Sequence, residues 1–201
     1  FFISSILFYL NDFVFIYLQN NAEMIYLFDY VFRVICLFIV YKFLNLKKLK
    51  IIDFKLNRRE GGLLFLWSIL LGFLGVITSK YIGEGLTSVL GDYGAYFNYP
   101  AHPSTLWKVI DLSLGVLLVA ISEELIFRKI LIDWLDKKLS DKLAIILISS
   151  FAFGFIHWGS GVASILGTFL WGIIPGTYYL YTKKLGPCIF AHFVTNLVVF
   201  Y

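Results

Sequence analysis

Two adjacent glutamates and an arginine interrupt an otherwise apolar segment in the second half of the chain. Residues 115–132 read GVLLVAISEELIFRKILI, so that Glu123, Glu124 and Arg128 lie among aliphatic side chains. Each such group costs about 2.5–3.5 kcal/mol at the centre of a bilayer on insertion scales. Carboxylates present despite this cost are candidates for acid–base chemistry, because a desolvated carboxylate can take a proton from water.

Helical spacing gives these three residues different roles. Glu124 and Arg128 are four residues apart, in the order that favours an ion pair on one helix face. Glu123 points about 100° away around the helix and has no counter-ion on the same helix. We therefore predict Glu123 as a general base, with Glu124 and Arg128 as its support. The alternative is a helix end that is exposed to cytoplasmic water.

Two further polar groups occur in later apolar segments. FGFIH at residues 153–157 contains His157, and HFVTN at residues 192–196 places His192 and Asn196 one helical turn apart. A rise of about 1.5 Å per residue puts the three groups at similar depths. We expect them to share a pocket within the membrane, although each histidine taken singly could instead make an interhelical hydrogen bond.

Two hydrolytic chemistries fit this set of side chains. In a metal-free scheme, Glu123 assisted by His157 deprotonates a water that attacks a peptide carbonyl, and His192 and Asn196 stabilise the oxyanion. In a zinc-dependent scheme, Glu123, His157 and His192 are the ligands and one position stays open, although the H-E-x-x-H arrangement is absent. A serine-protease interpretation with Ser122 is weaker, because neither a G-x-S-x-G nor a Ser-Lys arrangement supports it.

The composition places these motifs in an integral membrane protein. Of 201 residues, 60% are hydrophobic and 15% are charged, whereas soluble domains have about 45–50% apolar and about 25% charged residues. No basic stripe accompanies a soluble domain, so we expect no nucleic-acid partner. Cys36 and Cys188 lie in apolar segments and are interpreted as small buried hydrophobes rather than as a disulfide or metal pair.

The apolar segments predict an all-α, polytopic transmembrane bundle of about seven spans. Residues 1–104 form an N-terminal part with about three helices, a basic linker at 42–60 and an outer loop at 80–105. Residues 105–201 form a catalytic core of about four helices. Lysine and arginine gather at 42–60, 137–142 and 183–184, so the positive-inside rule predicts that these ends and the N-terminus are cytoplasmic. The expected spans are residues 2–19, 24–41, 62–79, 106–127 (with a continuation to 136), 142–158, 162–181 and 186–201.

Polar residues in the N-terminal part have no predicted catalytic role. Asp29 and Arg33 are four residues apart and are expected to pair with each other. Three other polar residues have no partner that the sequence identifies, and we expect them near membrane interfaces or helix contacts: Asn11, Asp12 and Asp111.

The three motifs together resemble a known family. EELIFR matches E-E-x-x-x-R, FGFIH matches F-x-x-x-H and HFVTN matches H-x-x-x-N. Their order and spacing are similar to those of the CAAX protease and bacteriocin-processing (CPBP, or Abi) family of intramembrane endopeptidases, related to the type II CAAX prenyl protease. The resemblance covers about residues 105–200, and no key position departs from it.

This resemblance implies an all-helical membrane endopeptidase. A glutamate of the first motif and the histidine of the second activate water, while the final histidine and asparagine stabilise the oxyanion. These roles fall on Glu123, His157, His192 and Asn196, with Glu124 and Arg128 in support. The resemblance leaves the use of zinc or any other metal open.

The leading hypothesis is an intramembrane peptidase of the bacterial cytoplasmic membrane, in contact with its lipids and acting on a peptide or membrane-protein substrate. The resemblance implies peptide maturation, bacteriocin processing or immunity, or signalling. The competing hypothesis is a non-catalytic membrane protein that binds and regulates an envelope protein, as relatives with eroded motifs do.

Overall fold

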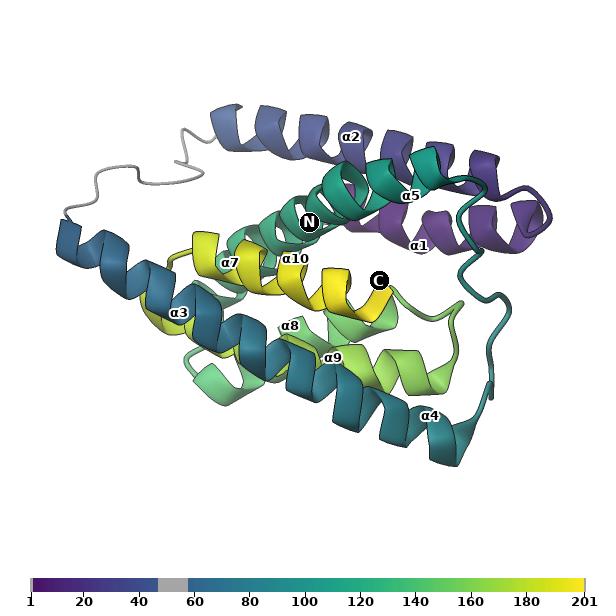
Figure 1. The fold of residues 1–201 in the computed structure, drawn as a ribbon. Helices are drawn as coiled ribbons and strands as arrows, with labels where there is room; N and C mark the ends of the chain where they lie inside the picture. The colour runs from purple at the N-terminus through teal and green to yellow at the C-terminus, as the bar shows by residue number, and fades with distance from the viewer. Residues whose placement is uncertain (1, 47–57, 201) are drawn as a thin grey trace.

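The computed structural model describes residues 2–46 and 58–200, and the predicted all-α class is confirmed (Figure 1). In this part of the chain the only β contact is an isolated bridge between Ala95 and Ser160. Four basic residues of the predicted linker lie outside the described residues: Lys47, Lys48, Lys50 and Lys55. The α-helices are α1 (Phe2–Leu18), α2 (Ala22–Leu46), α3 (Arg58–Ile77), α4 (Glu84–Leu90), α5 (Thr105–Ile110), α6 (Val116–Glu124), α7 (Asp133–Asp136), α8 (Lys142–Phe155), α9 (Val162–Thr182) and α10 (Gly186–Phe200), and the π-helical segments are η1 (Thr78–Gly83), η2 (Asp111–Gly115) and η3 (Leu125–Ile132).

Two long helices each consist of several parts that π-helical segments join, and the first of them is longer than the sequence predicts. Through η1, the helix that begins with α3 continues to Leu90, so the outer loop expected at 80–105 begins only at Gly91. Gly83 keeps right-handed helical angles, whereas Gly91 has a φ of +56°, which favours glycine and ends the helix. The elements α5, η2, α6, η3 and α7 likewise follow one another without a break from Thr105 to Asp136. This is the longer form of the fourth predicted span.

Two segments of the described chain are long and apolar enough to cross a membrane, Ala22–Asn45 and Glu60–Leu90. Large apolar side chains on both are exposed, including Phe38, Phe65 and Phe73, as expected for helices that face lipid acyl chains. The apolar helices Phe8–Leu18, Lys142–Phe155 and Gly186–Val199 are shorter. The total of seven spans therefore stays a prediction.

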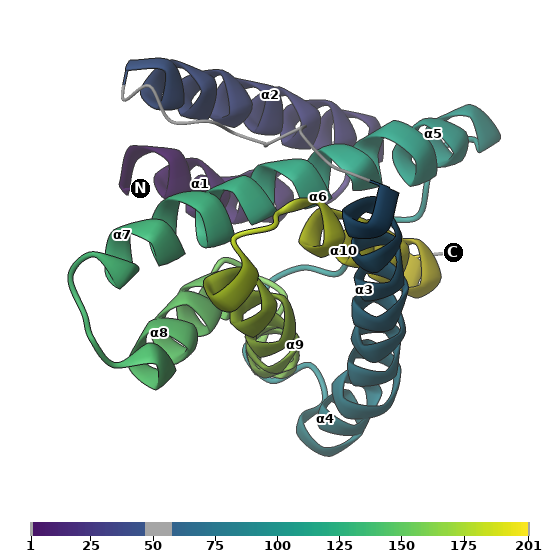
Figure 2. The ribbon, with the colours of Figure 1, turned by 90° about the vertical axis from the view of Figure 1, so that its left-hand side faces the viewer.

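The helix that contains the two glutamates crosses the centre of the bundle. Figure 2 shows it between the α1–α2 pair on one side and α8, α9, α10 and α3 on the other. Its α6 part packs against α2 and α10, and its η3 part packs against α8 and α9. Ile126, Phe127 and Arg128 have no exposed surface. A helix enclosed by others is apolar on most faces, which explains the aliphatic residues that surround the two glutamates.

Helices α8 and α9 approach closely through glycine. A Cβ atom added to Gly154 of α8 would lie 2.6 Å from the Ile165 carbonyl oxygen of α9. One added to Gly172 of α9 would lie 3.2 Å from the Phe153 ring of α8. Both contacts are shorter than carbon atoms tolerate without movement. The small residues therefore set the distance at which α9 holds the end of α8, where His157 follows.

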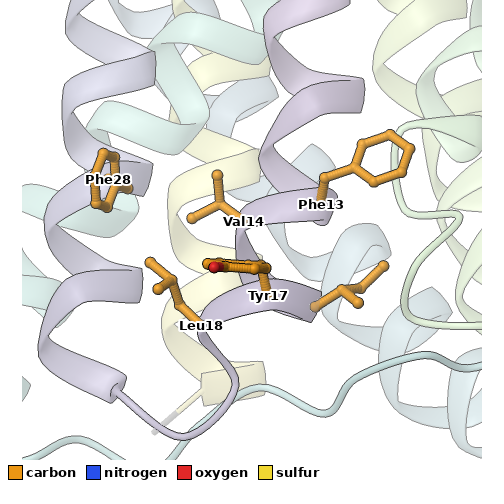
Figure 3. A pocket seen from close by; sticks show the side chains of 6 residues that line it. Phe13, Val14, Tyr17, Leu18 and Phe28 are labelled. Carbon is orange, nitrogen blue, oxygen red and sulfur yellow. The ribbon is translucent and has the colours of Figure 1, made fainter.

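An apolar hollow lies on α1 and α2, with a volume of about 690 Å³. Figure 3 shows Phe13, Val14, Tyr17 and Leu18 of α1 and Phe28 of α2 around it; Ile16 also lines it. None of these side chains is charged, and Tyr17 is 88% exposed. The hollow contains none of the predicted site residues, and its lining suits a lipid acyl chain.

Candidate active site

Glu124 is bound at both carboxylate oxygens. Its Oε2 accepts a hydrogen bond from Arg128 Nε at 3.0 Å, so the ion pair predicted from the spacing is present. Its Oε1 lies 3.0 Å from His192 Nδ1 of α10. Glu124 has no exposed surface. With both oxygens engaged and no contact with solvent, this carboxylate is arranged to hold its neighbours in place.

The position of Arg128 gives the phenylalanine of the second motif a structural role. Its Nη1 and Nη2 atoms are buried and have no hydrogen-bond partner. Instead the guanidinium carbon lies 4.9 Å from the centre of the Phe153 ring and 6.0 Å from that of Trp171. A desolvated cation over an aromatic face gains about 2 kcal/mol or more. The contact links the two glutamates to α8 and α9.

Glu123 differs from Glu124 in having one unoccupied oxygen. Its Oε1 accepts a hydrogen bond from Arg33 Nη1 at 2.8 Å. Its Oε2 is buried without a hydrogen-bond partner and lies 3.7 Å from His192 Nε2. Glu123 thus has no counter-ion on its own helix but has one on another helix. The counter-ion comes from α2, a helix that the motif spacing could not connect to α6.

Arg33 joins the N-terminal helices to the first motif. Its Nε lies 2.9 Å from Asp29 Oδ2, the pair predicted from the spacing, while its Nη1 reaches Glu123. Asn11 of α1 donates to Asp29 Oδ1 at 2.6 Å. Arg33 Nη1 also lies 3.4 Å from Ser122 Oγ, which itself donates to the Val119 carbonyl. A buried polar chain thus runs from α1 through α2 to α6, with Ser122 as one of its hydrogen-bonding members.

His157 lies in the turn that follows α8. Its Nδ1 is 3.3 Å from the Phe153 carbonyl oxygen. If Nδ1 carries the proton of a neutral ring and donates to this carbonyl, Nε2 is an acceptor. The turn is fixed from two sides, because Gly159 N donates to Asp12 Oδ2 of α1 at 2.7 Å and the Gly159 carbonyl accepts from Tyr96 N at 2.8 Å. Asp12, which the sequence left unexplained, positions this turn.

One cavity of about 990 Å³ gathers the four residues to which catalytic roles were assigned. Glu123, His157, His192 and Asn196 all line it. Asn196 is half-buried and lies one turn beyond His192 on α10. The cavity extends to the exposed segment at residues 91–102, between α4 and α5. That segment crosses the right-hand end of the bundle in Figure 1.

The residues suggested for zinc do not form a metal site in this arrangement. Within residues 2–46 and 58–200, no group of three His, Cys, Asp or Glu side chains could hold an ion. One oxygen of Glu123 is bound by Arg33, and Nδ1 of His192 is bound by Glu124. Cys36 and Cys188 are both buried. We therefore derive no catalytic step through a metal.

Comparison with known proteins assigns the second half of the chain. Residues 105–198 match the family model described as type II CAAX prenyl endopeptidase Rce1-like. This half of the chain is Rce1-like. The resemblance to the CAAX protease family is thereby confirmed, and the family is one of integral membrane proteases. Curated proteins and solved structures give no significant match.

The limits of the Rce1-like match separate two sets of site residues. All six residues predicted from the motifs lie within residues 105–198. Arg33 and Asp12, which contact the glutamate and the histidine turn, lie before its start. Sequence patterns missed both, and the only signal that could have found them was that each is a charged residue inside an apolar helix.

Proposed function

We propose that the protein is an intramembrane endopeptidase in which Glu123, assisted by His157, activates water to hydrolyse a peptide bond. The substrate is a peptide or a membrane-associated protein. The observation that carries the proposal is the unpartnered Oε2 of Glu123 on a cavity that also has His157, His192 and Asn196 in its lining. Glu124, with both oxygens engaged, lacks such a free atom.

The reaction begins with proton transfer to Glu123. Glu123 Oε2 takes a proton from a water molecule while the oxygen of that water attacks the carbonyl carbon of the scissile peptide bond. The 3.7 Å between Glu123 Oε2 and His192 Nε2 exceeds a hydrogen bond, so a water can contact both atoms. His157 Nε2, as an acceptor, helps to orient this water.

The tetrahedral intermediate places a negative charge on the former carbonyl oxygen. The Asn196 amide can donate to this oxyanion without any change of protonation. His192 already uses Nδ1 toward Glu124, so it donates from Nε2 only when both ring nitrogens carry a proton. Collapse breaks the C–N bond, and the proton on Glu123 passes to the leaving amine.

We place the enzyme in the bacterial cytoplasmic membrane with the N-terminus inside. The lysine-rich ends of α7, α8 and α9 support this orientation through the positive-inside rule. Peptide maturation, bacteriocin processing or immunity, and signalling are the roles proposed for such an activity. Glu84, Asp92 and the rest of the outer segment would then face away from the cytoplasm.

Replacement of Glu123 by glutamine tests the proposal. The Glu123→Gln variant keeps the size of the side chain and its contact with Arg33 but removes the base. Peptide cleavage by the purified, reconstituted protein should fall by about 10²–10⁴-fold, with an unchanged melting temperature. Activity equal to that of the wild type would contradict the proposal. If the wild-type protein cleaves no peptide and Glu123→Gln leaves the cellular phenotype intact, the non-catalytic alternative is favoured.

A further inference from the structure

We propose that the cavity admits a cationic peptide segment through the end of the bundle formed by residues 91–104, and that a lysine or arginine of this segment binds beside Asn11 and Asp12. The inference rests on the proposed peptidase function. It adds the charge of the substrate and the direction from which it enters. Three features of the cavity support it: the charge of its lining, its unpartnered acceptors and the position of its mouth.

The lining of the cavity is strongly acidic. Among the residues that the structure describes, the lining contains six carboxylates but only one arginine, Arg33, and no lysine. Arg33 is shared by two of the carboxylates, and a third binds His102. A cleft that is lined by one sign of charge and has low-dielectric walls concentrates ligands of the opposite sign. The six carboxylates are those of Asp12, Asp29, Glu84, Asp92, Asp111 and Glu123.

Two buried acceptors on the cavity wall lack donors. Glu123 Oε2 is one, and Asn11 Oδ1 is the other. Asn11 is only 6% exposed. Its orientation is fixed, because a carboxylate oxygen such as Asp29 Oδ1 can accept only from the NH₂ group of an amide. Asn11 lines the cavity, and its Oδ1 has no donor among the described residues; an unsatisfied buried acceptor is costly. A ligand rich in N–H groups, such as a lysine ammonium or arginine guanidinium, satisfies it.

Asn11 is connected to the proposed base, Glu123, by a continuous chain of contacts. The chain passes from Asn11 to Asp29, then to Arg33 and Glu123. Asp12, the next residue on α1, uses Oδ2 to hold the turn of His157. A basic side chain bound at Asn11 and Asp12 would therefore be connected to Glu123 through this chain and to His157 through its turn.

The mouth of the cavity is at the end of the bundle opposite the lysine clusters. The lining residues Ser88, Asp92 and Asn98 are exposed at this end. Figure 1 shows the segment between α4 and α5 at one end of the bundle and the end of α7, followed by Lys137 and Lys138, toward the other. Because lysine-rich ends are retained in the cytoplasm, a substrate that enters by this mouth comes from the extracytoplasmic side.

Cleavage of matched peptides tests the charge preference. Internally quenched peptides with one common apolar sequence would carry lysine, glutamine or glutamate at each position near the scissile bond. The reconstituted wild-type protein should cleave the best lysine peptide at least fivefold faster, in kcat/KM, than its glutamine counterpart, with the glutamate peptide slowest. The advantage should shrink at 0.5 M salt, since salt screens the attraction. Equal rates for lysine and glutamine peptides at low salt would overturn the inference.

Variants of acidic residues at the mouth test where the preference for lysine peptides arises, and they leave the catalytic residues unchanged. Glu84→Gln and Asp92→Asn should each lower the lysine-to-glutamine ratio of kcat/KM about two- to fivefold, the size expected for loss of one partly exposed charge. Glu23 is an exposed carboxylate in the first turn of α2 and is not part of the cavity lining. Its replacement by glutamine should leave the ratio unchanged. An equal effect of all three variants would show a nonspecific surface potential and overturn the proposed binding site.

A binding measurement separates failure of this inference from failure of the proposed function. Fluorescein-labelled lysine and glutamine peptides would be titrated with the Glu123→Gln protein and followed by anisotropy. Tighter binding of the lysine peptide while the wild type cleaves neither peptide supports the charged cavity and contradicts the peptidase function. Cleavage of both peptides at the same rate, with equal binding, supports the peptidase function and overturns the inference.

Discussion

Arg33 of α2 and Glu123 of α6 are joined by a 2.8 Å hydrogen bond in the buried centre of the bundle. Arg33 is 5% exposed and Glu123 is 2% exposed. The guanidinium occupies Oε1, which leaves only Oε2 directed at the cavity. It also gives one of the two adjacent glutamates a counter-ion in an apolar environment, as Arg128 does for the other. One partner lies outside the Rce1-like match, and the N-terminal helices therefore help to form the site.

Replacement of Arg33 should affect turnover as well as stability. A hydrogen bond between charged groups contributes about 1.5–3 kcal/mol, so Arg33→Gln should lower kcat roughly 10- to 100-fold with little change in KM. Removal of one partner from a buried ion pair also costs about 3–5 kcal/mol of folding free energy. Arg33→Lys keeps the charge but not the two-sided geometry and should recover part of kcat.

The double variant Asp29→Asn/Arg33→Gln separates these two effects. It also removes the charge of Asp29, which Arg33→Gln alone leaves without its partner. The melting temperature in detergent should therefore recover toward that of the wild type. Glu123 still lacks its partner, so kcat should stay low. Recovery of kcat together with the melting temperature would show that Arg33 only stabilises the fold.

Asp12 should be needed to keep His157 in place. Asp12→Ala removes the acceptor of Gly159 N, and an unpaired buried backbone donor costs about 1–3 kcal/mol. We expect a loss of activity larger than the loss of stability, because the freed turn contains His157. Asp12→Asn retains an acceptor oxygen and should restore much of kcat. If alanine and asparagine variants are equally active, the contact does not position the turn.

The close approach of α8 and α9 should tolerate no added atom at Gly154. Gly154→Ala would place its Cβ 2.6 Å from a backbone oxygen and 2.9 Å from the Phe169 Cβ, so we expect destabilisation of about 1–3 kcal/mol. Gly62→Ala is the matched control, because no atom of the described residues lies within 4 Å of the added Cβ. Alanine is favoured over glycine in a helix by up to about 1 kcal/mol, so the control should unfold at an equal or higher temperature.

The sequence predicts those parts of the site that depend on spacing along one helix. Glu124 with Arg128 and Asp29 with Arg33 are pairs four residues apart, and helical geometry alone brings them together. The motifs also identify four residues that line one cavity, two of them on α10, one on α6 and one in the turn after α8.

Contacts between distant helices could not be predicted in this way. The partner of Glu123 and the anchor of the His157 turn both come from the first two helices. No periodicity relates residues on separate helices, and their meeting depends on how the α1–α2 pair packs against the long central helix. The end of α4 was also not predicted, because the π-helical segment η1 continues the helix past the apolar stretch to Leu90.

Asp136 should give the lysine-rich end of the bundle a pH-dependent stability. It follows the apolar part of the central helix and accepts hydrogen bonds from Lys142 and Lys183, which lower its pKa below the usual 3.8. A lowered carboxyl pKa contributes stability above the unfolded pKa, and this stability is lost as the pH falls through the folded pKa. Asp136→Asn should therefore lower the melting temperature at pH 7, and the difference from wild type should diminish below pH 3.8. A difference that is the same at pH 7 and pH 3 would contradict this role.

Cysteine labelling should show which side of the membrane the cavity faces. In a background without Cys36 and Cys188, Ser88→Cys introduces a thiol at the mouth and Lys138→Cys introduces one at the opposite, lysine-rich end. Both positions are exposed, so a membrane-impermeant maleimide reaches whichever lies outside. With the lysine-rich ends retained in the cytoplasm, intact cells should label Ser88→Cys at once and Lys138→Cys only after permeabilisation. The reverse pattern would place the mouth in the cytoplasm, and the source of the substrate would change sides with it.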